Sequence, residues 1–198
     1  LGLYPIFNKK LELNALIMES NQLTFDFTNN FKISNNQQAL DICEALSYLF
    51  CKDGISKINM KIDGKAVSSF ENTTIPLSCI TPNLGINNFD LYQTSSVLVY
   101  NEKEIAGKTY YIPTTTRIQN TNQTIDQKVS LLLDHFENNT KVETTKKSQL
   151  NDGLLSIYLS SRILDNSENI SPTLYSRLEK SFLSLPDVSS VHIYINNE

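Results

Sequence analysis

The amino-acid sequence predicts an α+β protein in which a unit of strands and helices occurs twice in tandem. The first observation is a strand–helix–strand pattern that occupies positions 23–63 and returns at positions 155–196. Apolar residues alternate with polar ones in the strands and recur every three or four residues in the helices. The second observation is the composition. Its 40% apolar and 19% charged residues are typical of a globular chain with a core.

The two occurrences of the pattern align residue by residue. Leu23–Phe31 matches Leu155–Ile163 at an offset of 132 residues. After a one-residue slip, the closing strands match at an offset of 133, with Ile58, Met60 and Ile62 corresponding to Val191, Ile193 and Ile195. An offset of this length indicates a duplicated domain and not a solenoid repeat.

The duplication sets the expected domain boundaries. We expect a first domain at 1–67, an ordered connector at 68–94 and a second domain at 95–198. Subtracting the offset from positions 96–126 gives numbers below 1, so we expect the first domain to be N-terminally incomplete, comprising its C-terminal half only. Its core face would then be partly open or covered by the connector.

The first domain is expected to form one hairpin, one helix and a closing strand. The expected bounds are 11–18 and 23–27 for the hairpin strands, 39–50 for the helix and 58–62 for the closing strand, with a short further strand near 66–67. Ser34 or Asn35 can cap the helix, because short polar side chains accept bonds from the first free backbone N–H groups. Asp63-Gly64 is a strong two-residue hairpin turn. In the connector, Pro76 and Pro82 exclude regular structure, but the segment is too apolar for a flexible linker. We expect its apolar side chains to lie along one or both domains.

The second domain is expected to begin with a hairpin and to end with a copy of the first. Its expected elements are strands at 96–101 and 109–118 joined by a polar turn at 102–108, a helix from 124, a strand at 155–159, a helix from 171 and a last strand at 191–195. Pro113 implies an edge position or a bulge. Thr124 and Ser171 are the expected helix caps, with Pro172 in the first turn. The polar stretch 148–153 is expected to form a poor strand.

Composition and spacing exclude several classes of function. A net charge of −4 and a pI of 5.3 argue against binding nucleic acid or anionic membranes through bulk charge. No run approaches the roughly 18 apolar residues of a membrane span. Cys43 and Cys51 lie about 12 Å apart on the expected helix, beyond disulfide reach, so these two and Cys79 are expected to pack as small apolar groups.

No combination of residues in the sequence predicts a catalytic, metal or cofactor site. His192 falls on the last strand, at the position that corresponds to Asn59 in the first copy. This correspondence predicts an exposed polar face. His135 is expected at the end of a helix, in solvent or near the helix dipole. Asp26 lies between two phenylalanines and is expected to face away from the core. Glycine-rich phosphate loops and calcium-loop spacing are absent from the sequence.

One stretch combines aromatic, hydroxyl and basic side chains on an expected edge strand. Its residues are Tyr110, Tyr111, Thr114, Thr116 and Arg117. They could line a groove for a glycan or a peptide, or form a β-edge that pairs with a partner. We favour the partner-binding edge.

The order of these segments resembles the GerMN (germane) domain family in two copies. Ser96–Ile118 is similar to the family's opening hairpin, Gly2–Phe31 to its middle, and both Leu183–Asn196 and Asp53–Lys65 to its closing strand. Positions 75–90 resemble the connector between two such domains. The resemblance covers nearly the whole chain.

The resemblance implies two tandem domains with a fold similar to the ring-building motif, each a small sheet with helices packed on one face. It also implies a structural role. Members are secreted or lipid-anchored, and a two-copy member works between the mother-cell and forespore membranes, in a channel-like secretion complex. The implied protein is a non-catalytic assembly component needed for spore formation and germination, without a cofactor. It would be extracytoplasmic and reach the membrane only through a lipid anchor outside this chain. Its implied partners are other sporulation proteins and further copies of itself.

A second hypothesis is an extracytoplasmic module that binds peptidoglycan. It predicts a concave site with aromatic and polar side chains and retention on the cell wall. The assembly hypothesis predicts self-association or partner binding without a ligand pocket.

Overall fold

The computed structural model describes residues 5–7, 11–30, 33, 35–87, 96–117, 123–136 and 142–196. The chain divides into two compact units, unit 1 at Leu1–Gln93 and unit 2 at Thr94–Glu198. Both contain helices and sheets, which confirms the predicted α+β class. The boundaries of the two copies, and the N-terminal incompleteness of the first, stay predictions.

Unit 1 is a four-stranded sheet with a helix between its second and third strands. Its elements are β1 (Leu13–Glu19), β2 (Gln22–Phe27), α1 (Asn36–Phe50), β3 (Lys57–Ile62), β4 (Lys65–Ala66) and the short 3₁₀ helix η1 (Pro82–Leu84). The strand order is β1-β2-β3-β4, and β2 and β3 run parallel because α1 crosses between them. Asn35 is the cap, since its side chain accepts a bond of 2.9 Å from the backbone N–H of Gln38. Asp63 and Gly64, with φ of 48° and 75°, form the expected turn into β4.

The connector belongs to the core of unit 1. Phe70, Ile75, Leu77 and Ile80 are buried against α1 and the sheet. Backbone bonds fix the segment to β3: Ile58 and Ile80 exchange bonds of 2.8 and 2.9 Å, and Met60 donates to Leu77 at 2.9 Å. The expectation that the apolar side chains of the connector lie along a domain is therefore confirmed for Ile75, Leu77 and Ile80, while Phe89 and Leu91 lie outside the described residues.

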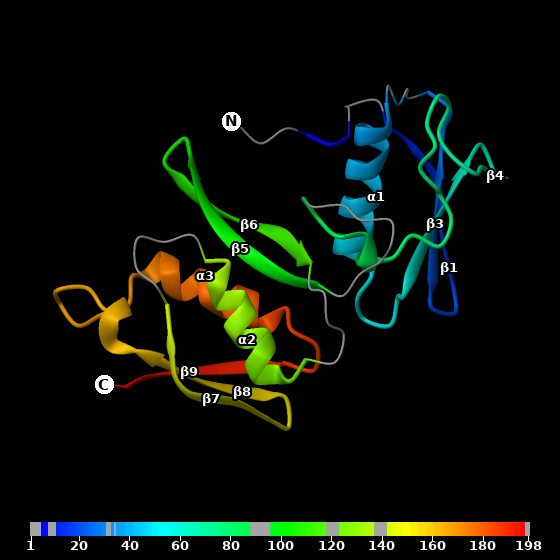
Figure 1. Ribbon diagram of the computed structural model, residues 1–198. Coiled ribbons are helices and arrows are strands. Elements are labelled where there is room, and N and C mark those ends of the chain that lie inside the picture. Colours follow the sequence, from blue (N-terminus) through cyan, green and yellow to red (C-terminus); the bar gives the residue numbers. More distant parts are fainter. Residues whose placement is uncertain are drawn as a thin grey trace. The chain divides into compact units, whose positions relative to one another are not determined.

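Unit 2 combines a two-stranded ribbon, two α-helices and a three-stranded sheet. Its elements are β5 (Ser96–Ile105), β6 (Lys108–Arg117), α2 (Ile125–Asp134), β7 (Thr144–Asn151), β8 (Leu154–Ser160), the 3₁₀ helix η2 (Ser161–Ile163), α3 (Pro172–Leu183) and β9 (Ser190–Asn196). Within this unit, α2 and α3 lie between the ribbon and the β7-β8-β9 sheet (Figure 1). Thr124 and Ser171 cap the two helices as predicted, and Thr124 forms a capping box with Gln127.

The predicted duplication is visible in the strand register. In unit 1, β2 pairs in parallel with β3, so that Leu23, Phe25 and Phe27 lie opposite Ile58, Met60 and Ile62. In unit 2, β8 pairs in parallel with β9, so that Leu155, Ile157 and Leu159 lie opposite Val191, Ile193 and Ile195. These are the residues that the sequence offset matched. The same residues also anchor each core, because one face of each sheet is buried by its crossover helix.

Two predictions about unit 2 were wrong. The polar turn expected at 102–108 is mostly strand, because Ala106 and Gly107 close a two-residue turn with φ of 51° and 73°. The stretch 148–153, expected to be a poor strand, contributes its first four residues to β7, although the pairing of β7 with β8 shifts register twice, between Thr144 and Lys146 and between Lys146 and Gln149.

Side chains on the outer face of the sheet explain how the polar β7 is held. The ammonium of Lys146 lies 5.5 Å from the ring centre of Tyr158, and that ring stacks on Tyr194 at 5.0 Å. This row runs across all three strands, and cross-strand pairs of this kind stabilise a sheet without apolar alternation.

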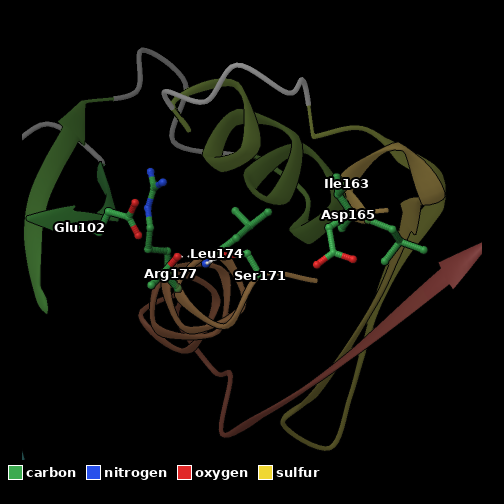
Figure 2. Close-up of a pocket in the computed structure, with 8 residues that line it drawn as sticks. Glu102, Ile163, Asp165, Ser171, Leu174 and Arg177 are labelled. Carbon is green, nitrogen blue, oxygen red and sulfur yellow. Dashed lines mark hydrogen bonds between the residues drawn. The ribbon is translucent and has the colours of Figure 1, made fainter. Parts of the chain in front are cut away.

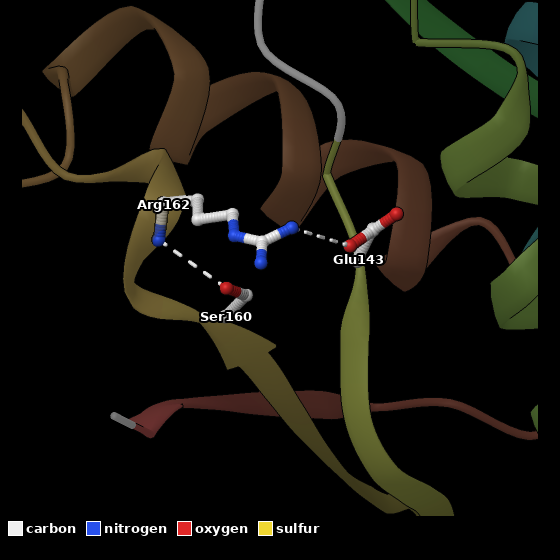
Figure 3. A network of polar contacts seen from close by, with 3 residues as sticks. All are labelled: Glu143, Ser160 and Arg162. Carbon is white, nitrogen blue, oxygen red and sulfur yellow. Dashed lines mark hydrogen bonds and ion pairs between the residues drawn. The ribbon is translucent and has the colours of Figure 1, made fainter. Parts of the chain in front are cut away.

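The end of β8 is closed by a small polar network. Ser160 caps η2 by accepting a bond of 3.3 Å from the backbone N–H of Arg162, and the Arg162 guanidinium lies 3.4 Å from the Glu143 carboxylate (Figure 3). The Arg162 side chain is 63% exposed. An ion pair in this setting is screened by water and contributes little to stability.

Candidate functional site

The predicted partner-binding residues all lie on β6, the outer strand of the ribbon. β5 and β6 pair without a register shift, from Ser96 opposite Arg117 to Ile105 opposite Lys108. Within the described residues, β5 is the single strand partner of β6. The sequence therefore placed these residues correctly on a strand at the edge of a sheet.

The other edge of the ribbon is closed by α3. Ser181 accepts a bond of 2.9 Å from the Tyr100 N–H, and Arg177 donates one of 3.1 Å to the Tyr100 carbonyl. Ser184 donates to the Leu98 carbonyl at 3.4 Å. Helix side chains thus satisfy backbone groups of β5 that a further strand would otherwise take. Any additional strand would have to approach from the side of β6.

Pro113 fits this arrangement without a bulge. It lies opposite Tyr100, whose N–H and C=O both point towards α3. When the N–H and C=O of one residue in an antiparallel pair point away from the partner strand, those of the residue directly opposite point away as well. A proline at that position costs no bond between β5 and β6.

The five predicted residues do not share one surface. Tyr110, Thr114 and Thr116 lie opposite Lys103, Val99 and Val97, and the two valines are buried in the core of unit 2. Tyr111 and Arg117 alternate to the opposite face.

Their surroundings differ as well. The ammonium of Lys180 lies 5.6 Å from the ring centre of Tyr111. Tyr110 is the exposed member, at 39%, and the other four are half-buried. Partner binding by this edge stays a prediction. Of the five side chains, that of Tyr110 is the most accessible to a partner.

Arg177 is a structural residue that the sequence did not reveal. Besides its bond to Tyr100, it donates to the Asn101 amide oxygen at 3.1 Å, and its guanidinium carbon lies 5.0 Å from the Phe136 ring centre. It is buried although charged. Its position one turn after Leu174, on the apolar face of α3, could have indicated that Arg177 is buried. The sequence could not identify its partners, because they lie on β5, more than 70 residues away.

Two surface hollows in unit 2 lack the features of a saccharide site. One, of about 260 Å³, lies between β5, η2 and the start of α3, with Glu102 and Arg177 on one side and Asp165 on the other (Figure 2). The other, of about 270 Å³, is lined by residues of α2 and β7 and the segment before β7. Neither lining contains an aromatic ring, on which bound sugars commonly stack.

The titratable residues singled out from the sequence are not brought together. His135 ends α2 and His192 lies on the outer face of β9, both exposed as predicted. Asp26 faces away from the helix side of its sheet but is buried, and its carboxylate accepts the Gly64 N–H at 2.9 Å. Its role is to hold the β3–β4 turn. Among the described residues, no group of three or more His, Cys, Asp or Glu side chains could hold a metal ion.

The three cysteines differ in environment, which corrects the expectation that all of them are packed. Cys43 is buried, Cys51 is half-buried and Cys79 is exposed. Burial, together with the neighbouring Glu44 carboxylate, raises the pKa of Cys43 to about 12. Burial also raises the pKa of Cys51. A thiol that stays protonated is a poor nucleophile, so neither residue is suited to covalent catalysis.

Thiol labelling at pH 8 is expected to separate the three residues. Cys79 should react first with a disulfide reagent, Cys51 more slowly, and Cys43 only when unit 1 unfolds. The Cys79→Ser variant should lose the fast phase and keep the other two. Rapid labelling of Cys43 in the native protein would contradict its described burial.

The whole length of this chain is similar to part of a spore germination protein. No family model matches it. It is 23% identical over 221 aligned residues to the spore germination protein GerM of Bacillus subtilis (strain 168), covering 100% of this chain and 59% of that relative. The chain thus spans less than two thirds of the relative's length. A solved structure of the tandem GerMN domains of the sporulation protein GerM from Bacillus subtilis matches with a TM-score of 0.77 at 22% identity. This match covers 96% of this chain and 74% of that one. The resemblance to tandem GerMN domains is therefore confirmed in the fold.

Proposed function

We propose that this protein is a non-catalytic structural component of the sporulation machinery, needed for spore formation and germination. It would act between the mother-cell and forespore membranes, as part of the channel or secretion complex that links the two compartments. The observation that carries the proposal is the similarity along the full chain to a spore germination protein, together with the matching tandem fold.

The distribution of polar side chains supports a structural role. The two units share their buried strand residues and not their polar ones: Asp26 in β2 corresponds to Tyr158 in β8, and Asn59 in β3 to His192 in β9. A catalytic group common to both copies would have the same residue type at matching positions, and these positions differ. The duplication therefore retains the buried residues of the fold and not a set of polar groups.

The location we propose is extracytoplasmic, with membrane attachment through a lipid anchor and a fold of the ring-building type. Within the described part of the chain, no helix combines the length and the apolarity that crossing a bilayer requires. The partners we propose are other sporulation proteins and further copies of this chain, bound at the β6 edge.

Deleting the gene in its own host is expected to lower the yield of heat-resistant spores and to leave vegetative growth unchanged. The intact gene should restore the yield. A Tyr110→Ser variant should restore it less well than a Tyr175→Ser variant, because both tyrosines are about 40% exposed in unit 2 but Tyr110 lies on β6 and Tyr175 on α3. Normal sporulation and germination in the deletion strain would refute the proposal.

Two measurements on the purified protein separate the assembly role from wall binding. Analytical ultracentrifugation is expected to show self-association, or complex formation with sporulation proteins. Sedimentation with purified peptidoglycan is expected to leave the protein in solution. Retention on peptidoglycan by a strict monomer would favour the wall-binding module instead.

A further inference from the structure

The last strand of unit 2, β9, has one unpaired edge. All seven of its residues pair in parallel with β8, without a register shift. Within the described part of the chain, β8 is the single strand that pairs with β9. Ser190 donates its N–H at 3.1 Å to Gly153, the residue before β8. Because backbone groups alternate in direction along a strand, those of Val191, Ile193 and Ile195 point to the open edge.

The corresponding edge of unit 1 shows that an extended segment can bind in this position. Ile58, which corresponds to Val191, exchanges backbone bonds of 2.8 and 2.9 Å with Ile80 of the connector. Ile58 and Met60 are 0% and 2% exposed, whereas their counterparts Val191 and Ile193 are half-buried. A segment added to β9 would therefore find free backbone groups and apolar side chains beside them.

The sequence of β9 does nothing to prevent such pairing. Proteins commonly protect an exposed edge with charged side chains, proline or irregular register. At the other edge of the same sheet, β7 has Lys146, Lys147 and two register shifts. The β6 edge has Lys108, Pro113 and Arg117. β9 is regular, contains no proline and reads SVHIYIN, which is uncharged when its histidine is neutral.

This strand is also complementary to itself. An antiparallel pair of β9 strands centred on Ile193 would place an apolar residue opposite an apolar residue on the helix side of the sheet. On the outer face, an imidazole would lie opposite a phenol ring, and a hydroxyl would lie opposite an amide. The opposed residues would be Ile193 with Ile193, Val191 with Ile195, His192 with Tyr194, and Ser190 with Asn196.

The aromatic row on the outer face would continue across this pair. The Tyr158 and Tyr194 rings stack with 5.0 Å between their centres, and Tyr194 is the last ring of the row at the β9 edge. It is 44% exposed. His192 of a second copy would lie opposite Tyr194, in the type of antiparallel pair where side chains approach most closely.

We propose that the β9 edge is a docking site for a second copy of this chain, whose own β9 pairs with it antiparallel about a two-fold axis at Ile193. The outward backbone groups of both strands would form up to about six hydrogen bonds. Because each copy uses the same edge once, the assembly closes as a dimer and does not extend into a fibre. This edge is separate from β6, and the proposal does not depend on the proposed function.

Two measurements on the full chain test the pairing. Sedimentation over a range of concentrations is expected to show a monomer–dimer equilibrium. Amide hydrogen exchange by NMR should identify the contact. Exchange at Val191, Ile193 and Ile195 should slow as the concentration rises, because these N–H groups gain partners only in the dimer. Exchange at His192 and Tyr194 should change less, since their N–H groups already point to β8.

Charged variants of β9 test the opposed positions. In His192→Lys/Tyr194→Lys, each lysine would face a lysine of the second copy, which should weaken the dimer at least about tenfold. His192→Glu/Tyr194→Glu should weaken it for the same reason. Mixing the two variants should restore a dimer with one chain of each kind, because opposite charges then meet. Each variant loses the ring that stacks on Tyr158, so the loss of stacking cannot explain recovery on mixing.

Two further variants are the controls. Tyr175→Lys changes a tyrosine on α3 that is 40% exposed, similar to Tyr194, and should dimerise like the unaltered chain. Tyr110→Ser changes the β6 edge and should also leave the dimer intact. Circular dichroism of each charged variant should show the spectrum of the folded chain.

Three results would overturn the proposal. The first is a strict monomer at roughly 1 mM, where even weak specific pairs are populated. The second is a folded pair of charged variants that form no mixed dimer. The third is self-association that Tyr110→Ser removes and both charged variants retain, because the contact would then belong to β6.

Discussion

Replacing Phe182 by alanine is expected to destabilise unit 2 by ~3–5 kcal/mol, the cost of removing a large aromatic side chain from a packed core. Phe182 is fully buried on α3, in the cluster that joins the ribbon, both helices and the sheet. A domain of this size is stabilised by only about 5–15 kcal/mol in total, so the loss is a large part of the whole. Urea unfolding followed by circular dichroism measures it.

The neighbouring Leu183 provides the control for this substitution. It is 41% exposed on the same helix, so Leu183→Ala should cost less than about 1 kcal/mol. Because the chain has two compact units, two transitions are expected, and only that of unit 2 should shift in Phe182→Ala. Equal losses from the two substitutions would mean that α3 does not present Phe182 to the core as described.

The sequence revealed the parts of the fold that local periodicity controls. Alternation in β2 and β8 selected the buried face, and the offset between the copies matched residues that hold equivalent places in the two sheets. The caps Thr124 and Ser171 were recognisable because capping depends on side chains within three residues of the helix start. Each of these signals is local, or is repeated at a fixed spacing.

The features that the sequence did not reveal depend on distant partners. β7 is a strand despite its polar sequence, because backbone pairing with β8 and the Lys146–Tyr158–Tyr194 row hold it. Arg177 is buried because acceptors on β5 lie within reach, which only the folded chain brings about.

The five residues of the candidate edge lie on one strand, as the sequence indicated, and their use by a partner stays a prediction. These residues alternate between the two faces of β6, as a strand requires, so they were never going to form one continuous patch. Among these five residues, the exposed ring of Tyr110 is what a partner would meet first.

Gly153→Ala is expected to destabilise unit 2 more than an ordinary turn glycine would. Gly153 has a φ of +80°, which costs a residue with a side chain about 1–2 kcal/mol. Here, an added Cβ would also overlap Ser189 Oγ and lie 3.4 Å from Ser189 Cβ. Turning the exposed Ser189 hydroxyl aside would break its bond of 3.2 Å to the Gly153 carbonyl, which adds about 0.5–1.5 kcal/mol. Relief by movement is restricted, because the Gly153 carbonyl accepts the N–H groups of Ser189 and Ser190 at 2.8 and 3.1 Å, which joins the β7–β8 turn to the start of β9.

Gly107→Ala separates the two contributions. Gly107 closes the ribbon turn with a φ of +73° and has no atom within 4 Å of an added Cβ, so it should show the backbone cost alone. In a Ser189→Ala background the overlapping hydroxyl is absent, and Gly153→Ala should then cost about as much as Gly107→Ala. The unfolding free energies of the single and double variants form a cycle whose coupling measures the overlap directly. If Gly153→Ala and Gly107→Ala are equally destabilising with Ser189 intact, the Ser189 hydroxyl must turn aside without loss, and the overlap contributes nothing.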